Sequence, residues 1–150
     1  KNKCYGQWQI LDIDDIEEAM EISYNDARDA INYMKPDLVV GSSLGAALLF
    51  KLYASGGYTG PGVFLAPAVP HLIKDEDITS GCATIKDYNT TWLLGEVDTV
   101  VSNTGNVEIA KRCNGNIIFS PNDCHRLLKA QSSGILDAAI LTSIETNSRS

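Results

Sequence analysis

Ser43 carries the clearest chemical signal in this sequence, because it is the central residue of a G-S-S-L-G segment at positions 41–45. The pattern G-x-S-x-G is typical of a nucleophile elbow, a sharp turn between a strand and a helix that holds a serine hydroxyl at the edge of a sheet. An apolar-rich segment at 37–40 precedes the motif and an apolar segment at 46–50 follows it, as this context requires. The motif therefore predicts a nucleophilic serine at position 43.

The other residues of the motif have expected roles in the same turn. Gly41 and Gly45 lack a Cβ, which predicts that strand and helix pass close to each other at both positions. The backbone N–H of Leu44, at the start of the helix, is a candidate donor to the oxyanion that forms during acyl transfer. Ser42 helps to shape the turn and is a candidate for substrate contact.

An aspartate and a histidine follow the motif in the order that a serine, acid and histidine triad has in proteins with this elbow. Asp98 comes shortly after an apolar segment at 90–95, and His125 comes shortly after another at 116–120. The carboxyl ends of parallel strands meet at one edge of a sheet, so the three side chains can lie together. We expect His125 to accept the proton of the serine hydroxyl and Asp98 to orient the imidazole.

Several neighbouring residues allow other interpretations. Glu96 is a rival of Asp98 for the role of the acid. Asp123 could pair with His125, although a turn-forming aspartate explains it equally well. Cys124 has no separate base, so we interpret it as a bystander thiol.

The loop after a further apolar segment, at 63–66, contains more candidates. Pro70 and His71 follow it closely and are candidates for substrate contact. An exposed loop histidine is the simpler interpretation of His71.

Short apolar segments alternate with helical patterns along the chain. This alternation predicts a three-layer α/β sandwich with a mostly parallel sheet of about five strands. The expected strands are residues 7–13, 37–40, 63–66, 90–95 and 116–120, and the expected helices cover 16–34, the segment after the elbow, 107–113 and 135–144. The polar stretch at 74–89 predicts a short helix or an irregular crossover. Because no linker, repeat or low-complexity tract divides the chain, we expect a single domain over 1–150.

Charge and cysteine content exclude some classes of partner. The net charge of −7 disfavours nucleic acid and anionic membranes as partners, and no apolar run reaches the length of a membrane span. The four cysteines have neither disulfide-framework nor zinc-site spacing. We therefore expect reduced thiols, a cytoplasmic protein and no metal; the oligomeric state stays open.

The G-S-S-L-G motif, the P-A-V-P-H segment at 67–71 and the acid and histidine segments together resemble the small, esterase-type members of the α/β-hydrolase superfamily. The resemblance covers about residues 37–128. It implies hydrolysis of a small carboxylic ester or thioester through an acyl-enzyme on Ser43, without a cofactor.

This chain departs from that superfamily at its N-terminal side. Such hydrolases have a preceding strand ending in a His-Gly loop that supplies the second oxyanion donor, and neither is found in this sequence. We expect either a truncated N-terminus or pairing of the 7–13 strand directly with the elbow strand. A backbone N–H in 12–16 is then the candidate second donor.

Two other functions fit the same residues. A catalytically weak or inactive binding protein could keep the hydrolase frame, which predicts no covalent labelling of Ser43. An acyltransferase would use the same acyl-enzyme but would need an acceptor other than water.

The stretch at 67–89, where this superfamily inserts substrate-covering lids, is short and predicts an open site.

Overall fold

The computed structural model describes residues 13–145 of the chain. Within them, four strands form one open sheet in the order β1-β2-β3-β4, and every neighbouring pair is parallel. The strands are β1 (Val39–Ser42), β2 (Gly62–Leu65), β3 (Thr90–Gly95) and β4 (Asn116–Ser120). The helices are α1 (Ile13–Met34), α2 (Leu44–Ala54), α3 (Val69–Leu72), α4 (Asp75–Ile85), α5 (Asn103–Arg112), α6 (Leu128–Ser133) and α7 (Ile135–Glu145). The described part is thus an α/β fold.

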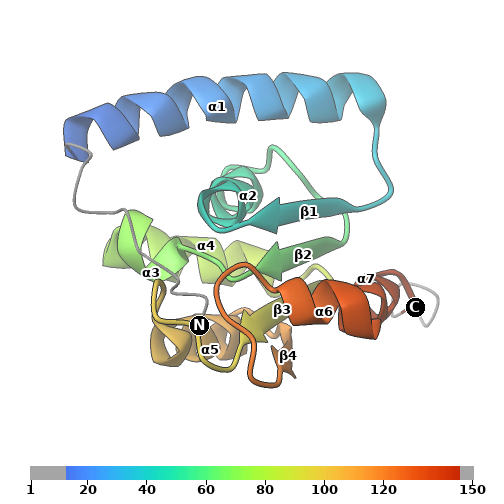
Figure 1. The fold of residues 1–150 in the computed structure, drawn as a ribbon. Helices are drawn as coiled ribbons and strands as arrows, with labels where there is room; N and C mark the ends of the chain where they lie inside the picture. The colour runs from blue at the N-terminus through green and yellow to red at the C-terminus, as the bar shows by residue number, and fades with distance from the viewer. Residues whose placement is uncertain (1–12, 146–150) are drawn as a thin grey trace.

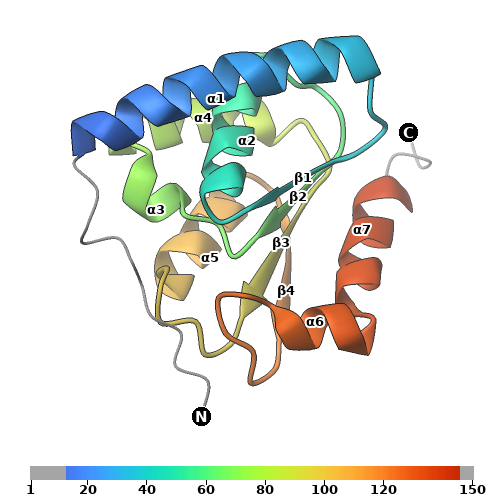
Figure 2. The ribbon, with the colours of Figure 1, turned by 45° about the horizontal axis from the view of Figure 1, so that its top comes forward.

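Helices cover both faces of the sheet (Figures 1 and 2). On one face α2 and α5 contact the strands, α4 packs between these two helices, and α1 crosses over α2. On the other face α7 contacts β2, β3 and β4, and α6 packs against α7. Spatial order follows chain order, and crossovers between parallel strands share one hand, so the connections from β1 to β4 lie on the same face. The chain after β4 then covers the opposite face.

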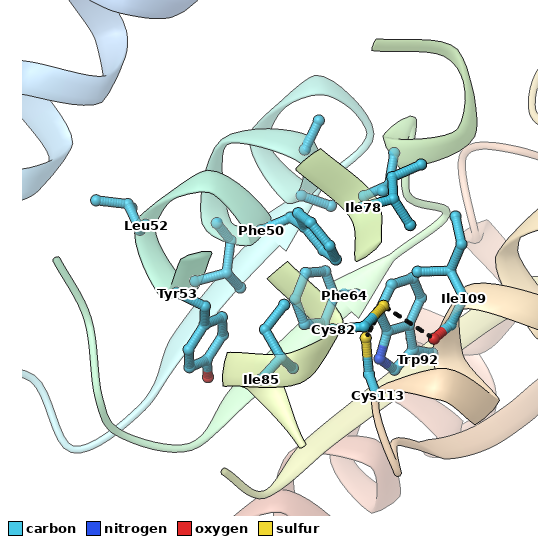
Figure 3. Close-up of a cluster of buried hydrophobic side chains, with 14 of the residues drawn as sticks. Phe50, Leu52, Tyr53, Phe64, Ile78, Cys82, Ile85, Trp92, Ile109 and Cys113 are labelled. Atoms are coloured by element: carbon cyan, nitrogen blue, oxygen red, sulfur yellow. Dashed lines mark hydrogen bonds between the residues drawn. The ribbon is translucent and has the colours of Figure 1, made fainter. Parts of the chain in front are cut away.

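The central strands β2 and β3 are buried on both sides, which explains their largely apolar composition. Phe64 and Trp92, neighbours on β2 and β3, point toward the α2 face and stack with ring centroids 4.3 Å apart (Figure 3). Val63 and Leu93, which precede and follow them, belong to the cluster on the α7 face. This double burial fixes the register of the sheet and hence the position of each strand end.

Most of the expected strands are confirmed. β3 and β4 have the expected bounds, and β2 begins one residue earlier than expected. The elbow strand begins at Val39 rather than at residue 37 and continues to Ser42. The described residues hold four strands rather than five. The strand expected at 7–13 lies outside the described residues except for Ile13, which begins α1.

The helical pattern at 16–34 forms one continuous helix, α1, whose apolar stripe packs on the core through Ile16, Met20, Tyr24, Ala27 and Ile31. The polar stretch at 74–89 contains a regular helix, α4. The short helices α3 and α6 had no clear periodic signal in the sequence. No helix in the described ranges combines the length and the apolar character needed to cross a bilayer.

Candidate active site

Ser43 lies at the turn between β1 and α2 with φ 52° and ψ −112°. A non-glycine residue in such a conformation costs on the order of 1–3 kcal/mol and persists only when its surroundings enforce it. Here the Ser43 N–H donates to the Leu65 carbonyl at 2.8 Å, and the Ser43 carbonyl accepts from Ala68 at 3.1 Å. Further bonds to that carbonyl come from Ala46 and Ala47 in α2. The turn is therefore held from both β2 and α2.

The two glycines of the motif differ in their surroundings. A Cβ on Gly41 would lie 2.6 Å from the Gly45 carbonyl oxygen and 2.8 Å from the Ala46 Cα, so only glycine allows α2 to pass this close to β1. A Cβ on Gly45 would meet nothing within 4 Å. The expectation of a close approach is confirmed for Gly41 and is wrong for Gly45 among the described residues.

The side chains of Ser43, His125 and Asp98 form a continuous chain of hydrogen bonds. His125 Nε2 lies 2.8 Å from Ser43 Oγ, and His125 Nδ1 lies 2.9 Å from Asp98 Oδ2. With the proton on Nδ1, the imidazole donates to Asp98 and accepts from the serine hydroxyl. This arrangement can remove a proton from Ser43 while the aspartate stabilises the resulting imidazolium.

The Asp98 carboxylate is fixed on every side by hydrogen bonds. Its side chain is 0% exposed, and its Oδ1 accepts from the N–H groups of Val100 at 2.8 Å and Val101 at 3.1 Å. Burial raises the pKa of Asp98, but the bonds from His125, Val100 and Val101 outweigh that effect and hold the pKa below its ordinary value. Asp98 is therefore a carboxylate at neutral pH.

The loop that carries His125 packs tightly against the end of β3. A Cβ on Gly95 would lie 2.5 Å from the Cys124 carbonyl oxygen and 2.8 Å from that of Asp123. The Asp123 carbonyl also accepts a hydrogen bond from Val97 at 2.9 Å. Gly95 thus brings the acid loop and the histidine loop into contact.

Asp123 organises the histidine loop from inside. Its residue is 2% exposed, and its carboxylate accepts hydrogen bonds from Ser120 Oγ at 2.9 Å, the Ala130 N–H at 2.8 Å and the Cys124 N–H at 3.0 Å. Burial raises the pKa of Asp123, but these donors, Ala130 first, outweigh it and lower the pKa below the ordinary value. Asp123 is a structural anchor between β4 and α6, not a partner of the His125 ring.

The remaining alternatives near the triad are resolved by their contacts. Glu96 Oε2 accepts from the Asn122 N–H at 2.7 Å, so this acid holds the histidine loop while Asp98 binds the imidazole. Cys124 is half-buried, and its N–H is bonded to Asp123. The imidazole next to it is bonded instead to Ser43.

The candidates for substrate contact lie on different elements. Ser42 ends β1 beside Ser43, and it is an exposed residue. Pro70 lies in α3 against Gly105, where an added Cβ would meet the proline ring at 3.1 Å. His71 Nε2 accepts a hydrogen bond from the Ser102 N–H at 3.1 Å. The contacts of Pro70 and His71 thus join α3 to the start of α5.

Leu44 is the first residue of α2, and its N–H has no hydrogen-bond partner within residues 13–145. It is available to an oxyanion formed on a substrate bound at Ser43, beside the positive end of the helix dipole. Of the segment 12–16 proposed for the second donor, residue 12 lies outside the described residues. Residues 13–16 form the first turn of α1.

Two asparagines of α5 support the site and were not singled out from the sequence. Asn103 Nδ2 donates to the Gly95 carbonyl at 2.8 Å, and the fully buried Asn106 donates to the Pro67 carbonyl at 2.9 Å. Together they tie α5 to the end of β3, which precedes Asp98, and to the loop that follows β2. The sequence position of Asn106 could have pointed to this role, because Asn106 falls in the apolar stripe with Ala110 and Cys113. A polar side chain buried in such a stripe needs a hydrogen-bond partner.

A cavity of about 650 Å³ lies elsewhere, between α1, α2 and α4. Met20, Tyr24 and Phe50 form part of its lining, and no residue of the triad does. The triad and this cavity are separate features of the molecule. No group of three or more His, Cys, Asp or Glu side chains among residues 13–145 is placed to hold a metal ion.

No model of a known protein family matches this chain, and comparison with curated proteins finds no match.

Proposed function

We propose that this protein is a serine hydrolase of the α/β-hydrolase type that cleaves a carboxylic ester or a thioester through an acyl-enzyme on Ser43. The observation that carries the proposal is the unbroken hydrogen-bond chain from the Ser43 hydroxyl through His125 to the buried Asp98 carboxylate. Its three residues come from the carboxyl ends of β1, β3 and β4. A hydroxyl, a base and an orienting acid in this order are what acyl transfer requires.

In the first half of the reaction, the Ser43 oxygen attacks the substrate carbonyl as its proton passes to His125 Nε2. Asp98 stabilises the imidazolium without taking its proton. The N–H of Leu44 donates to the oxyanion of the tetrahedral intermediate. His125 then returns the proton to the leaving alcohol or thiol, which leaves an acyl-Ser43 ester.

In the second half, water replaces the leaving group. His125, neutral again, takes a proton from a water molecule as that water attacks the acyl carbon. As the second tetrahedral intermediate collapses, His125 gives this proton to Ser43 Oγ, which releases the carboxylic acid and restores the Ser43 hydroxyl. The side chain of His125 is 16% exposed, so bulk water can reach this base.

The proposal is tested by the turnover of chromogenic short-chain esters and of a short acyl thioester. We expect saturable turnover by the wild-type protein and a loss of at least about 10³-fold in kcat for Ser43→Ala. Ser42→Ala is the matched control, because it removes the neighbouring hydroxyl and leaves the triad complete. Equal turnover by wild type and Ser43→Ala, with both folded, would refute the proposal.

A further inference from the structure

Two buried cysteine side chains lie next to each other in the core between α4 and α5, away from the triad. Cys82 belongs to α4, and Cys113 is the residue that follows the last turn of α5. Their sulfur atoms are 3.0 Å apart. Figure 3 shows the pair among the surrounding apolar side chains. Both residues are buried, Cys82 with 4% and Cys113 with 0% of its surface exposed. The sequence, by contrast, predicted four reduced thiols without a pairing pattern.

The separation of the two sulfurs is about 1 Å longer than a covalent S–S bond. A disulfide has an S–S distance of about 2.0 Å, so an approach of roughly 1 Å converts this contact into one. Since α4 and α5 pack directly against each other, the fold already holds the two sulfurs side by side. The two residues are 31 positions apart in the chain, which makes the pairing a product of the tertiary structure.

We propose that Cys82 and Cys113 are a covalent modification site, and that a small-molecule disulfide such as glutathione disulfide oxidises them to an intramolecular disulfide bond. The thiolate of Cys82 attacks the glutathione disulfide, displaces one glutathione thiolate and forms a mixed disulfide. The thiolate of Cys113 then attacks Cys82 Sγ and displaces the second glutathione. Each protein thiol gives its proton to one glutathione, so two thiols and one glutathione disulfide yield one protein disulfide and two glutathione thiols.

The contacts of the pair favour Cys82 as the attacking sulfur. The thiol of Cys113 donates a hydrogen bond to Cys82 Sγ, which lowers the pKa of Cys82, and the same bond raises the pKa of Cys113. The two sulfurs are shielded from solvent, so reaction with a large reagent follows local opening of α4 or of the end of α5. We therefore expect slow formation and, once formed, slow reduction.

The expected consequence is a more stable protein with an unchanged triad. The bond would close a loop of 31 residues and restrict the unfolded chain. It would join α4 to α5, and neither element carries Ser43, Asp98 or His125. For a loop of this size in a chain of this length, the unfolding midpoint should rise on the order of 10 °C.

The test is equilibration of the folded wild-type protein in glutathione buffers of increasing oxidised fraction, followed by alkylation and peptide mapping by mass spectrometry without reduction. We expect one disulfide-linked peptide pair containing Cys82 and Cys113. The oxidised protein should have a higher unfolding midpoint, and fluorophosphonate labelling of Ser43 should keep its rate. Cys82→Ala and Cys113→Ala should each abolish the pair and the rise in midpoint. Cys124→Ala is the matched control and should change neither.

A disulfide that joins other cysteines, thiols that stay reduced after equilibration, or an oxidised form with a lower midpoint would overturn the proposal. Peptide mapping of the wild type decides the matter even if an alanine variant fails to fold. The pairing and the midpoint are measured without substrate or labelling reagent, so these two results are independent of the proposed hydrolase activity.

Discussion

At the scale of single residues, the position of the Ser43 hydroxyl depends on the backbone more than on its own side chain. The strained turn is held by hydrogen bonds from β2 and α2, and the imidazole then meets the hydroxyl at 2.8 Å. His125 in turn depends on a loop anchored by a second buried carboxylate, that of Asp123. The triad therefore rests on groups that never touch the reacting atoms.

Asp123 gives a prediction about pH. Its folded-state pKa lies below the ordinary value, so it contributes stability at neutral pH that is lost as the pH falls through the acidic range. Asp123→Asn leaves at least one of the three donors around this site unpaired, which should cost about 1–3 kcal/mol of unfolding free energy at pH 7. The difference between wild type and variant should shrink below about pH 4, where the Asp123 carboxyl of the unfolded wild-type chain binds a proton while the folded one still resists protonation.

Denaturant unfolding of both proteins from pH 3 to pH 8 measures this difference. The lowered pKa of Asp98 is common to both proteins and cancels in the comparison. Asp87→Asn, on an exposed residue, is the control and should change stability little. A difference that is constant across this range would contradict the role given to the Asp123 charge.

At the scale of elements, the crossing of β1 and α2 depends on one glycine of the motif. Gly41→Ala places a Cβ against the backbone of Gly45 and Ala46, which cannot move without shifting α2. Overpacking of this kind should cost about 2–3 kcal/mol and reduce labelling of Ser43. Gly45→Ala enters open space in the first turn of a helix and should be neutral or stabilising by up to about 1 kcal/mol.

Unfolding midpoints of the two variants check this prediction as a matched pair. The unfolding midpoint of Gly41→Ala should lie below that of wild type, and the midpoint of Gly45→Ala should lie at or above it. Equal destabilisation by both substitutions would mean that Gly45 packs against a segment outside the described residues.

The strands and the triad residues were accessible from sequence because their signals are local. Buried parallel strands are continuous apolar runs, and the turn residues at their ends mark where polar side chains emerge, which is how Asp98 and His125 were found. The contacts of Asp123 and Asn106 and the proximity of Cys82 to Cys113 were not accessible. Each depends on which elements become neighbours, and local periodicity carries no information about that. The steric difference between Gly41 and Gly45 has the same origin.

At the scale of the whole molecule, β1 is an edge strand of the described sheet and leads directly to Ser43. The N–H groups of Val39 and Ser43 donate to the segment that contains β2. Successive N–H groups of a strand point to opposite edges, so those of Val40 and Ser42 face the edge at which no described strand pairs. The side chain of Val40 is also exposed.

This arrangement predicts an alternating pattern of amide hydrogen exchange along β1. The amides of Val40 and Ser42 should exchange markedly faster than those of Val39 and Ser43, because the latter pair is hydrogen-bonded within the sheet. Amides in the middle of β3, which pairs on both sides, serve as the protected reference. Slow exchange at Val40 and Ser42 would reveal a further strand on this edge, from outside the described residues or from a second molecule.

The central claim is that His125 activates Ser43, and fluorophosphonate labelling measures this most directly, because the reagent phosphonylates serines whose proton is removed by a neighbouring base. The intact mass of the wild-type protein should increase by one adduct, and peptide mapping should locate it on Ser43. His125→Gln, which should remove the base while the elbow remains, should slow labelling by at least about 10³-fold. Absence of an adduct on the folded wild type, or equal labelling of wild type and His125→Gln, would contradict the account.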